Sequence, residues 1–224
     1  GSDICFIIMS GISGIYCLDP ESKAELRLLK EMTSTIRHRG PDDEGYFLCC
    51  PENGFKALFS GEESTADVKA VLPRLDITAK ARLGLGFRRL ATLDLEASGH
   101  QPMSDPELGL HIVFNGNIYN HVELREELKQ AGYSFRSRSD TEVILKAYHA
   151  WGDDCLRHFN GIWALAIWDE KQRRLFCARD RFGVKHFYYC IHDQVLYFGS
   201  EIKQLLFTPV NKSLNRPMLW RAIN

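Results

Sequence analysis

Four short polar segments of the sequence contain residue types that could carry out chemistry. They lie at 9–15, 37–45, 115–120 and 139–142. Together they supply a serine hydroxyl, guanidinium groups, side-chain amides that can donate hydrogen bonds, and carboxylates. Groups of these kinds are used in nucleophilic catalysis.

Taken singly, each segment also has a structural explanation. Ser10 lies at a glycine-containing entry to a buried strand, and Gly-Pro-Asp-Asp at 40–43 is strong turn chemistry. Asn-Gly at 115–116, between apolar residues, predicts a hairpin turn. Ser139 and Glu142 fit a capping box at the start of a helix. Any one segment alone therefore favours structure over catalysis.

Composition limits the classes of function that need to be considered. The 224 residues, 45% of them hydrophobic, can bury a full core as one large domain or two small ones. A formal net charge of −1 argues against a nucleic-acid or acidic-membrane surface. No apolar run approaches the roughly 20 residues that span a bilayer. The seven cysteines and scattered histidines show no metal-ligand spacing, so we expect no metal site and a cytoplasmic location.

Hydrophobic periodicity predicts a mixture of strands and helices that must position the four segments. Strands are expected at 12–17, 81–94 and 109–119, helices at 21–36, 121–130 and 141–151, and antiparallel hairpins at 161–168 with 175–178 and 186–191 with 195–199. The segments 52–80 and 96–107 are expected to be irregular, the first as a surface insertion. Strands that are apolar on both faces need cover on both faces, so the pattern predicts an α+β fold of two packed sheets with helices outside.

The four segments occur with others in an order that resembles a known family. The chain reads RHRGPDDEG, GFRRLATLD, GHQPM, FNGNIYNHVELREEL, SDTEVIL, FNGIWALAIWD and RDRFGVKHFYY in succession. This resembles the glutaminase domain of class II (N-terminal nucleophile) glutamine amidotransferases, particularly asparagine synthetases, from Met9 to about Phe207. The resemblance implies a four-layer αββα sandwich of two mainly antiparallel sheets. With Gly1-Ser2 read as a tag remnant, the resemblance divides the chain into tag remnant and leader at 1–9, the glutaminase domain at 10–207, and at 208–224 the start of a linker to a missing synthetase domain.

The resemblance also implies roles for individual residues. Ser10 takes the place of the nucleophilic cysteine, and the Asn115 side chain with the Gly116 N–H forms the oxyanion hole. Arg89 binds the α-carboxylate of L-glutamine and Asp140 its α-ammonium group. The remaining expected pocket residues are Leu90, Ala91, Thr92, Leu93 and Asn117, the last standing where asparagine synthetases usually have glutamate. Arg39 and Asp42 are expected to brace the site.

The implied activity is hydrolysis of L-glutamine to glutamate and ammonia for an ATP-dependent amidation of the asparagine-synthetase type. No cofactor is expected in this domain, since ATP and magnesium belong to the C-terminal synthetase domain that would receive the ammonia. A homodimer is common in the family, whereas nucleic-acid and membrane partners are not expected.

Residue 10 departs from the family in two ways. A serine hydroxyl is harder to ionise than a thiol of pKa about 8.5. In the family the α-amino group of the nucleophile is the base, but the nitrogen of Ser10 is locked in a peptide bond to Met9. We therefore expect the chain as written to be inactive. An engineered Cys→Ser replacement, a natural degenerate member and a leader removed by maturation all fit, and the tag-like Gly1-Ser2 favours engineering.

Two alternatives remain open. One is an amidotransferase of the same fold that acts on a sugar, nucleotide-precursor or natural-product acceptor, which the length of the segment 52–80 keeps in view. The other is a non-catalytic glutamine-binding or scaffold domain, in which Arg89 and Asp140 bind glutamine while Ser10 carries out no chemistry.

Overall fold

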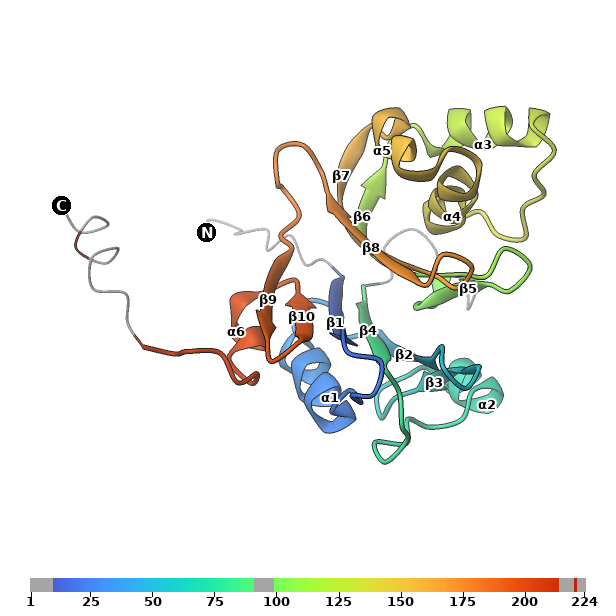
Figure 1. The fold of residues 1–224 in the computed structure, drawn as a ribbon. Helices are drawn as coiled ribbons and strands as arrows, with labels where there is room; N and C mark the ends of the chain where they lie inside the picture. Colours follow the sequence, from blue (N-terminus) through green and yellow to red (C-terminus); the bar gives the residue numbers. More distant parts are fainter. Residues whose placement is uncertain (1–9, 91–98, 214–219, 221–224) are drawn as a thin grey trace, which may run out of the picture.

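The computed structural model describes residues 10–90, 99–213 and 220, and places them in two antiparallel sheets with helices on the outer faces (Figure 1). The larger sheet has the strand order β3-β2-β4-β1-β10-β9. Its strands are β1 (Gly11–Cys17), β2 (Asp43–Cys50), β3 (Phe55–Ser60), β4 (Leu83–Arg89), β9 (Tyr188–His192) and β10 (Val195–Gly199). The smaller sheet, ordered β5-β6-β7-β8, contains β5 (Met103–Asp105), β6 (Leu110–Ile118), β7 (Gly161–Asp169) and β8 (Arg174–Arg179).

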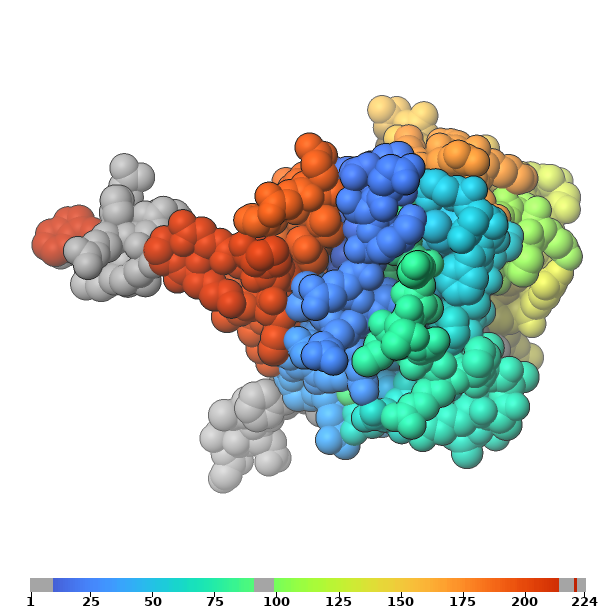
Figure 2. Space-filling view, turned by 60° about the horizontal axis from the view of Figure 1, so that its bottom comes forward, coloured from blue at the N-terminus to red at the C-terminus, as the bar shows by residue number. Residues whose placement is uncertain are grey.

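The helices are α1 (Leu26–Thr35), α2 (Ala66–Val71), α3 (His121–Gln130), α4 (Asp140–Trp151), α5 (Cys155–His158) and α6 (Ile202–Leu205), with a 3₁₀ turn η2 (Gly152–Asp154) between α4 and α5. After α6 the described chain leads away from the two-sheet body (Figure 2). None of the helices in the described residues is long and apolar enough to cross a membrane.

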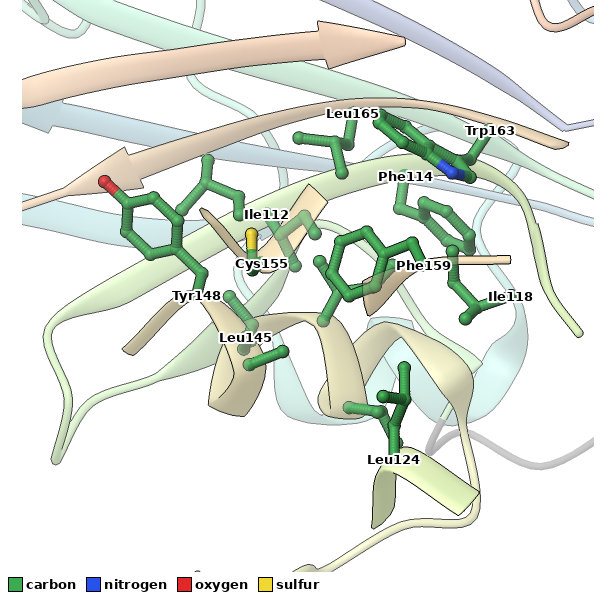
Figure 3. Close-up of a cluster of buried hydrophobic side chains, with 14 of the residues drawn as sticks. Ile112, Phe114, Ile118, Leu124, Leu145, Tyr148, Cys155, Phe159, Trp163 and Leu165 are labelled. Carbon is green, nitrogen blue, oxygen red and sulfur yellow. The ribbon is translucent and has the colours of Figure 1, made fainter. Parts of the chain in front are cut away.

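Three apolar layers hold the sheets and helices together. One lies between α1 and the larger sheet, where Leu29 and Met32 meet Ile15 of β1. A second lies between the two sheets and includes Trp168 of β7. The third lies between the smaller sheet and helices α3 to α5, and Figure 3 shows the side chains that fill it, Leu145 among them. Full burial of such a side chain contributes about 1.5–3 kcal/mol. The order helix–sheet–sheet–helix confirms the predicted four-layer α+β sandwich.

Local sequence explains where the helices begin and end. The Ser139 hydroxyl accepts a hydrogen bond from the Thr141 N–H at 3.1 Å and caps α4, which ends at Gly152 with φ of 57°. The predicted capping box is only half formed. The Glu142 carboxylate accepts from the N–H groups of Arg136 and Ser137 instead of from Ser139. It therefore fixes the approach to the helix as well as its first turn.

Several predicted elements are confirmed, and others are wrong. The helix at 121–130 and both C-terminal hairpins are present, as β7 with β8 and β9 with β10. The segment 52–80 is not an irregular insertion, because β3 extends the larger sheet and α2 packs Val68 inward. The first helix begins at Leu26 rather than 21, and the loop predicted at 96–107 contains the short strand β5. Residues 91–94 of the predicted strand 81–94 lie outside the described residues.

The strand expected at 109–119 is confirmed as β6 (Leu110–Ile118), whereas the hairpin turn that would explain Asn115-Gly116 structurally is not present. Both residues lie inside β6, where they pair with Ala164 and Trp163 of β7. A Cβ atom on Gly116 would lie 2.2 Å from the carbonyl oxygen of Ile162, so glycine is needed for the close approach of two strands. Strand pairing over nine residues outweighs the local preference of Asn-Gly for a turn.

Candidate active site

Strand alternation directs three of the expected site residues into the layer between the sheets. In β1 the inward residue is Ile12, which makes Ser10 the next position on the same face. In β4 the alternation that buries Phe87 brings Arg89 to this face, and in β6 Val113 is followed by Asn115. The apolar layer between the sheets therefore ends in a polar group of residues.

Ser10 is held by two contacts to neighbouring segments. Its Oγ accepts a hydrogen bond from the Leu90 N–H at 3.1 Å, and its carbonyl oxygen accepts from Arg39 Nε at 3.1 Å. Arg39 in turn donates from Nη1 to Glu201 at 3.2 Å. Glu201 thus anchors the arginine that contacts the backbone of residue 10.

The Asn115 amide and the His100 ring at this end of the layer each contain a buried nitrogen without a hydrogen-bond partner among the described residues. The Asn115 side chain is buried, with 1% of its surface exposed, yet within the described parts of the chain its Nδ2 has no hydrogen-bond partner. Leaving a buried donor unsatisfied costs about 1–3 kcal/mol. A catalytic role is one of the explanations for an unsatisfied buried donor.

Asp140 lies at the first position of α4 and reaches back to β6. Its Oδ2 accepts a hydrogen bond from the Ile118 N–H at 3.0 Å. Burial raises the pKa of the Asp140 carboxyl group, although the hydrogen bond from Ile118 and the nearby His121 oppose the shift. A carboxylate has about four lone-pair positions, so this bond leaves acceptor capacity for a cation.

The other expected pocket residues differ in their burial, and three of them lie outside the described residues. Arg89 is 7% exposed, and its guanidinium lies against Gly99, where a Cβ atom would be 2.3 Å from Nη2. The Arg89 carbonyl oxygen accepts from the Asp42 N–H at 3.1 Å. Asn117 is exposed. The expected lining residues Ala91, Thr92 and Leu93 lie outside the described residues.

Two residues near the site were not singled out by the sequence. His100 Nδ1 lies 2.7 Å from the buried carboxylate of Asp43, which is on the inward face of β2. The next residue, Gln101, hydrogen-bonds the backbone of Phe114, directly before Asn115. The only sequence signal for either was the segment GHQPM, whose residue types gave no indication of these partners. Among the described residues, no group of three His, Cys, Asp or Glu side chains could hold a metal ion.

Comparison with known proteins agrees with the sequence motifs. A family model described as "Glutamine amidotransferase domain" matches residues 74–224. Asparagine synthetase [glutamine-hydrolyzing] 3 of Bacillus subtilis is 37% identical over 203 residues, covering 90% of this chain and 28% of that protein. Putative asparagine synthetase [glutamine-hydrolyzing] 2 of Methanocaldococcus jannaschii is 38% identical over 222 residues, covering 92% of this chain and 37% of that protein. The chain thus spans about a third of the length of these relatives.

A solved structure supports the same fold independently. Glutamine phosphoribosylpyrophosphate amidotransferase from B. subtilis superposes with a TM-score of 0.70 at 20% sequence identity, over 88% of this chain and 43% of that one. At this identity the likeness concerns the fold alone. The family match, the asparagine synthetase relatives and the shared two-sheet fold show that the chain belongs to the glutamine amidotransferase domain family, as a class II domain of the asparagine-synthetase type.

Proposed function

We propose that this domain binds L-glutamine at the polar end of the layer between the sheets and that its architecture is built for hydrolysis of the side-chain amide to glutamate and ammonia. The observation that carries the proposal is the buried Nδ2 of Asn115, a donor without a partner in the described structure. In amide hydrolysis, negative charge appears on the amide oxygen only when the tetrahedral intermediate forms. A donor kept unsatisfied in the free protein suits that role.

Two charged residues provide recognition of an α-amino acid. Arg89 would bind the α-carboxylate through its planar guanidinium, and Asp140 the α-ammonium group through its remaining acceptor positions. The Leu90 N–H meets residue 10 directly, and the adjoining residues Ala91, Thr92 and Leu93 would line the pocket. The proposal needs no metal or cofactor in this domain.

The reaction would begin with attack by the side chain of residue 10 on the amide carbon of glutamine. That step needs a base, and a peptide nitrogen cannot accept the proton that a free α-amine of pKa about 7.7–8.0 would take. With serine at position 10, and with its nitrogen bonded to Met9, the chain as written binds glutamine but does not turn it over. The ammonia released by an active form would be used for an ATP-dependent amidation in a C-terminal synthetase domain. The whole protein would then be a cytoplasmic, homodimeric ligase.

The segment 52–80 carries no support for a different acceptor. Residues 55–60 are an edge strand of the larger sheet, and the Thr65 N–H donates a hydrogen bond to the Asp43 carboxylate at 3.1 Å. The segment is thus part of the scaffold. The asparagine-synthetase relatives favour carboxylate amidation over transfer to a sugar.

Calorimetric titration of the full chain with L-glutamine tests the recognition part of the proposal. We expect binding by the parent and a loss of at least about tenfold in affinity for Arg89→Met and Asp140→Asn, since each removes one charge-assisted contact. Arg82→Met is the matched control, because Arg82 pairs with Glu52 near the start of the same strand and contacts Cys17 and Leu18 rather than the site. Equal affinities for all four proteins would refute the proposed pocket.

A further inference from the structure

The outer edge of β6 is only partly covered by a neighbouring strand. β5 pairs Met103 with Ile112 and Asp105 with Leu110, and its last paired residue toward the site is Met103. β6 continues for six more residues, to Ile118. Backbone N–H and C=O groups on this stretch of the edge need partners other than a strand.

The carboxamide of Gln101 supplies the first of these partners. Continuing the register of β5 and β6 places Gln101 opposite Phe114. The Phe114 N–H donates to Gln101 Oε1 at 2.6 Å, and Gln101 Nε2 donates to the Phe114 carbonyl oxygen at 3.1 Å. The side chain thus makes the paired hydrogen bonds that a strand backbone would make. The Gln101 backbone turns away, with its carbonyl oxygen packed against Gly45 of the other sheet.

The same carboxamide reaches the helix that carries Asp140. Gln101 Nε2 lies 3.5 Å from the Thr141 hydroxyl in the first turn of α4. Gln101 is 6% exposed, and the three contacts join β6 to that turn. Two residues beyond Gly116, the Ile118 N–H is taken by the Asp140 carboxylate. The backbone of the β6 edge is therefore held at Phe114 by the Gln101 side chain and at Ile118 by the Asp140 side chain.

Gly116 lies between these two anchored positions, and its N–H points toward the same edge. Its partner across the ladder is Trp163, whose N–H and C=O are both bound to Asp180, at 3.2 and 2.7 Å. Those groups of Trp163 therefore face away from β6, and the pair is of the type that shares no ladder hydrogen bonds. The main-chain groups of Gly116 accordingly face outward, between Gln101 and Asp140.

We propose that Gln101 is a positioning residue that fixes the Asn115 side chain and the Gly116 N–H in the geometry needed to bind the oxyanion. It does so by taking the place of a missing strand at Phe114, one residue before Asn115. The catalytic part of this inference rests on the proposed glutaminase function. Its structural part, that the β6 edge is held by the carboxamide of Gln101, stands independently.

The structural part is tested in the full chain by amide hydrogen exchange. In Gln101→Met, which preserves length and removes both polar atoms, we expect the Phe114 N–H to exchange about tenfold faster or more. Gln101→Glu keeps the acceptor for the Phe114 N–H and should retain more of its protection than Gln101→Met. Ser104→Ala is the control, because Ser104 lies on β5 and bonds His111 rather than Phe114. Unchanged Phe114 exchange in Gln101→Met would overturn the proposal.

The catalytic part is tested in a form that begins at residue 10 and carries Ser10→Cys. Adding Gln101→Met should lower kcat about 100-fold with KM changed less than about threefold, since a misplaced donor affects the transition state more than the bound substrate. Gln101→Glu should recover part of the loss, while Ser104→Ala leaves kcat unchanged. A Gln101→Met protein that is folded at the assay temperature and keeps its kcat would refute the positioning role. If the parent itself releases no ammonia, the proposed function fails, and the exchange experiment still decides whether Gln101 holds the edge.

Discussion

Replacing Asn115 with leucine should stabilise the protein against unfolding. Asn115 is 1% exposed, and its Nδ2 lacks a partner within the described chain. Leucine has a similar branched shape and no polar atom. The substitution should remove the cost of a buried unsatisfied donor, about 1–3 kcal/mol, and we expect a net gain of about 1 kcal/mol in the free energy of unfolding after imperfect packing. For a chain of this length, such a gain raises Tm by about 2–4 °C.

A second buried amide provides the matched control. Gln204 is fully buried, and its Nε2 donates to the carbonyl oxygens of Ile12 and Met32 and to the Ser13 hydroxyl, at 3.1, 3.2 and 2.7 Å. Its Oε1 also accepts from the Glu201 N–H at 2.8 Å. Gln204→Met removes all these bonds and leaves their partners buried, so it should destabilise the protein by about 2 kcal/mol or more.

Urea unfolding of the parent and the two variants, followed by circular dichroism, measures the difference. The predicted result is a change of opposite sign in the two variants. If Asn115→Leu destabilises the protein as much as Gln204→Met, the Asn115 donor is satisfied in the folded state. Asn115 would then not be a donor reserved for an oxyanion.

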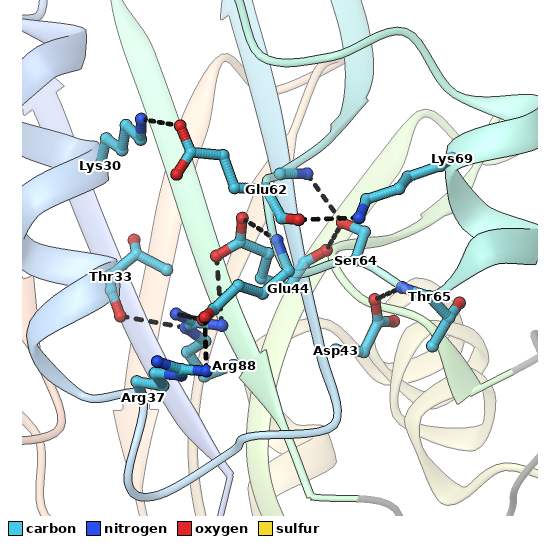
Figure 4. Close-up of polar contacts among 12 residues, drawn as sticks. Lys30, Thr33, Arg37, Asp43, Glu44, Glu62, Ser64, Thr65, Lys69 and Arg88 are labelled. Atoms are coloured by element: carbon cyan, nitrogen blue, oxygen red, sulfur yellow. Dashed lines mark hydrogen bonds and ion pairs between the residues drawn. The ribbon is translucent and has the colours of Figure 1, made fainter.

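Three further predictions concern ionisable groups, one of them in the proposed pocket and two in the scaffold. Arg88→Met should destabilise the protein by about 3–5 kcal/mol in urea unfolding, because it leaves the buried Glu44 carboxylate without its cation (Figure 4). A loss below about 1 kcal/mol would show that Arg88 and Glu44 do not form a buried ion pair. Burial raises the pKa of Asp140, so as the pH is lowered the affinity for L-glutamine should begin to fall above the usual carboxyl pKa of about 3.9. In calorimetry, Asp140→Asn should bind L-glutamine weakly and without this pH dependence. Identical pH profiles for the two proteins would contradict the role of Asp140. Burial lowers the pKa of His111, so the contribution of neutral His111 to stability is present above about pH 6.5 and is lost as the pH falls. The free energy of unfolding should therefore decrease less between about pH 7 and 5 in His111→Gln than in the parent. An equal decrease in the two proteins would refute the assignment.

Local patterns predicted the parts of the fold that depend on local signals. The helix at 121–130 has apolar spacing and a glycine stop at Gly132, where φ is 93°. The two C-terminal hairpins have short polar turns between apolar strands. Local patterns gave the wrong secondary structure where strand pairing between distant segments determines the conformation. β3 owes its place to β2, and Asn115-Gly116 is kept extended by β7.

The candidate site divides in the same way. Ser10, Asn115 and Asp140 could be assigned as candidates from the resemblance of the ordered motifs to the amidotransferase family, although each segment alone favoured a structural role. Gln101 and Glu201 could not be identified as supporting residues from composition or spacing. Their partners, Phe114 and Arg39, are 13 and 162 positions away, and each contact forms only when the strands of its own sheet have paired.

Ammonia release from L-glutamine tests whether residue 10 is the nucleophile of this domain. Two proteins are compared under the same conditions: the full chain, and a form that begins at residue 10 and carries Ser10→Cys. We predict turnover by the second form only, because only this form has both a thiol and a free α-amine at the same residue. Turnover by the full chain would contradict the account of residue 10. No turnover by either form, with glutamine still bound through Arg89 and Asp140, would identify the domain as a glutamine-binding scaffold instead.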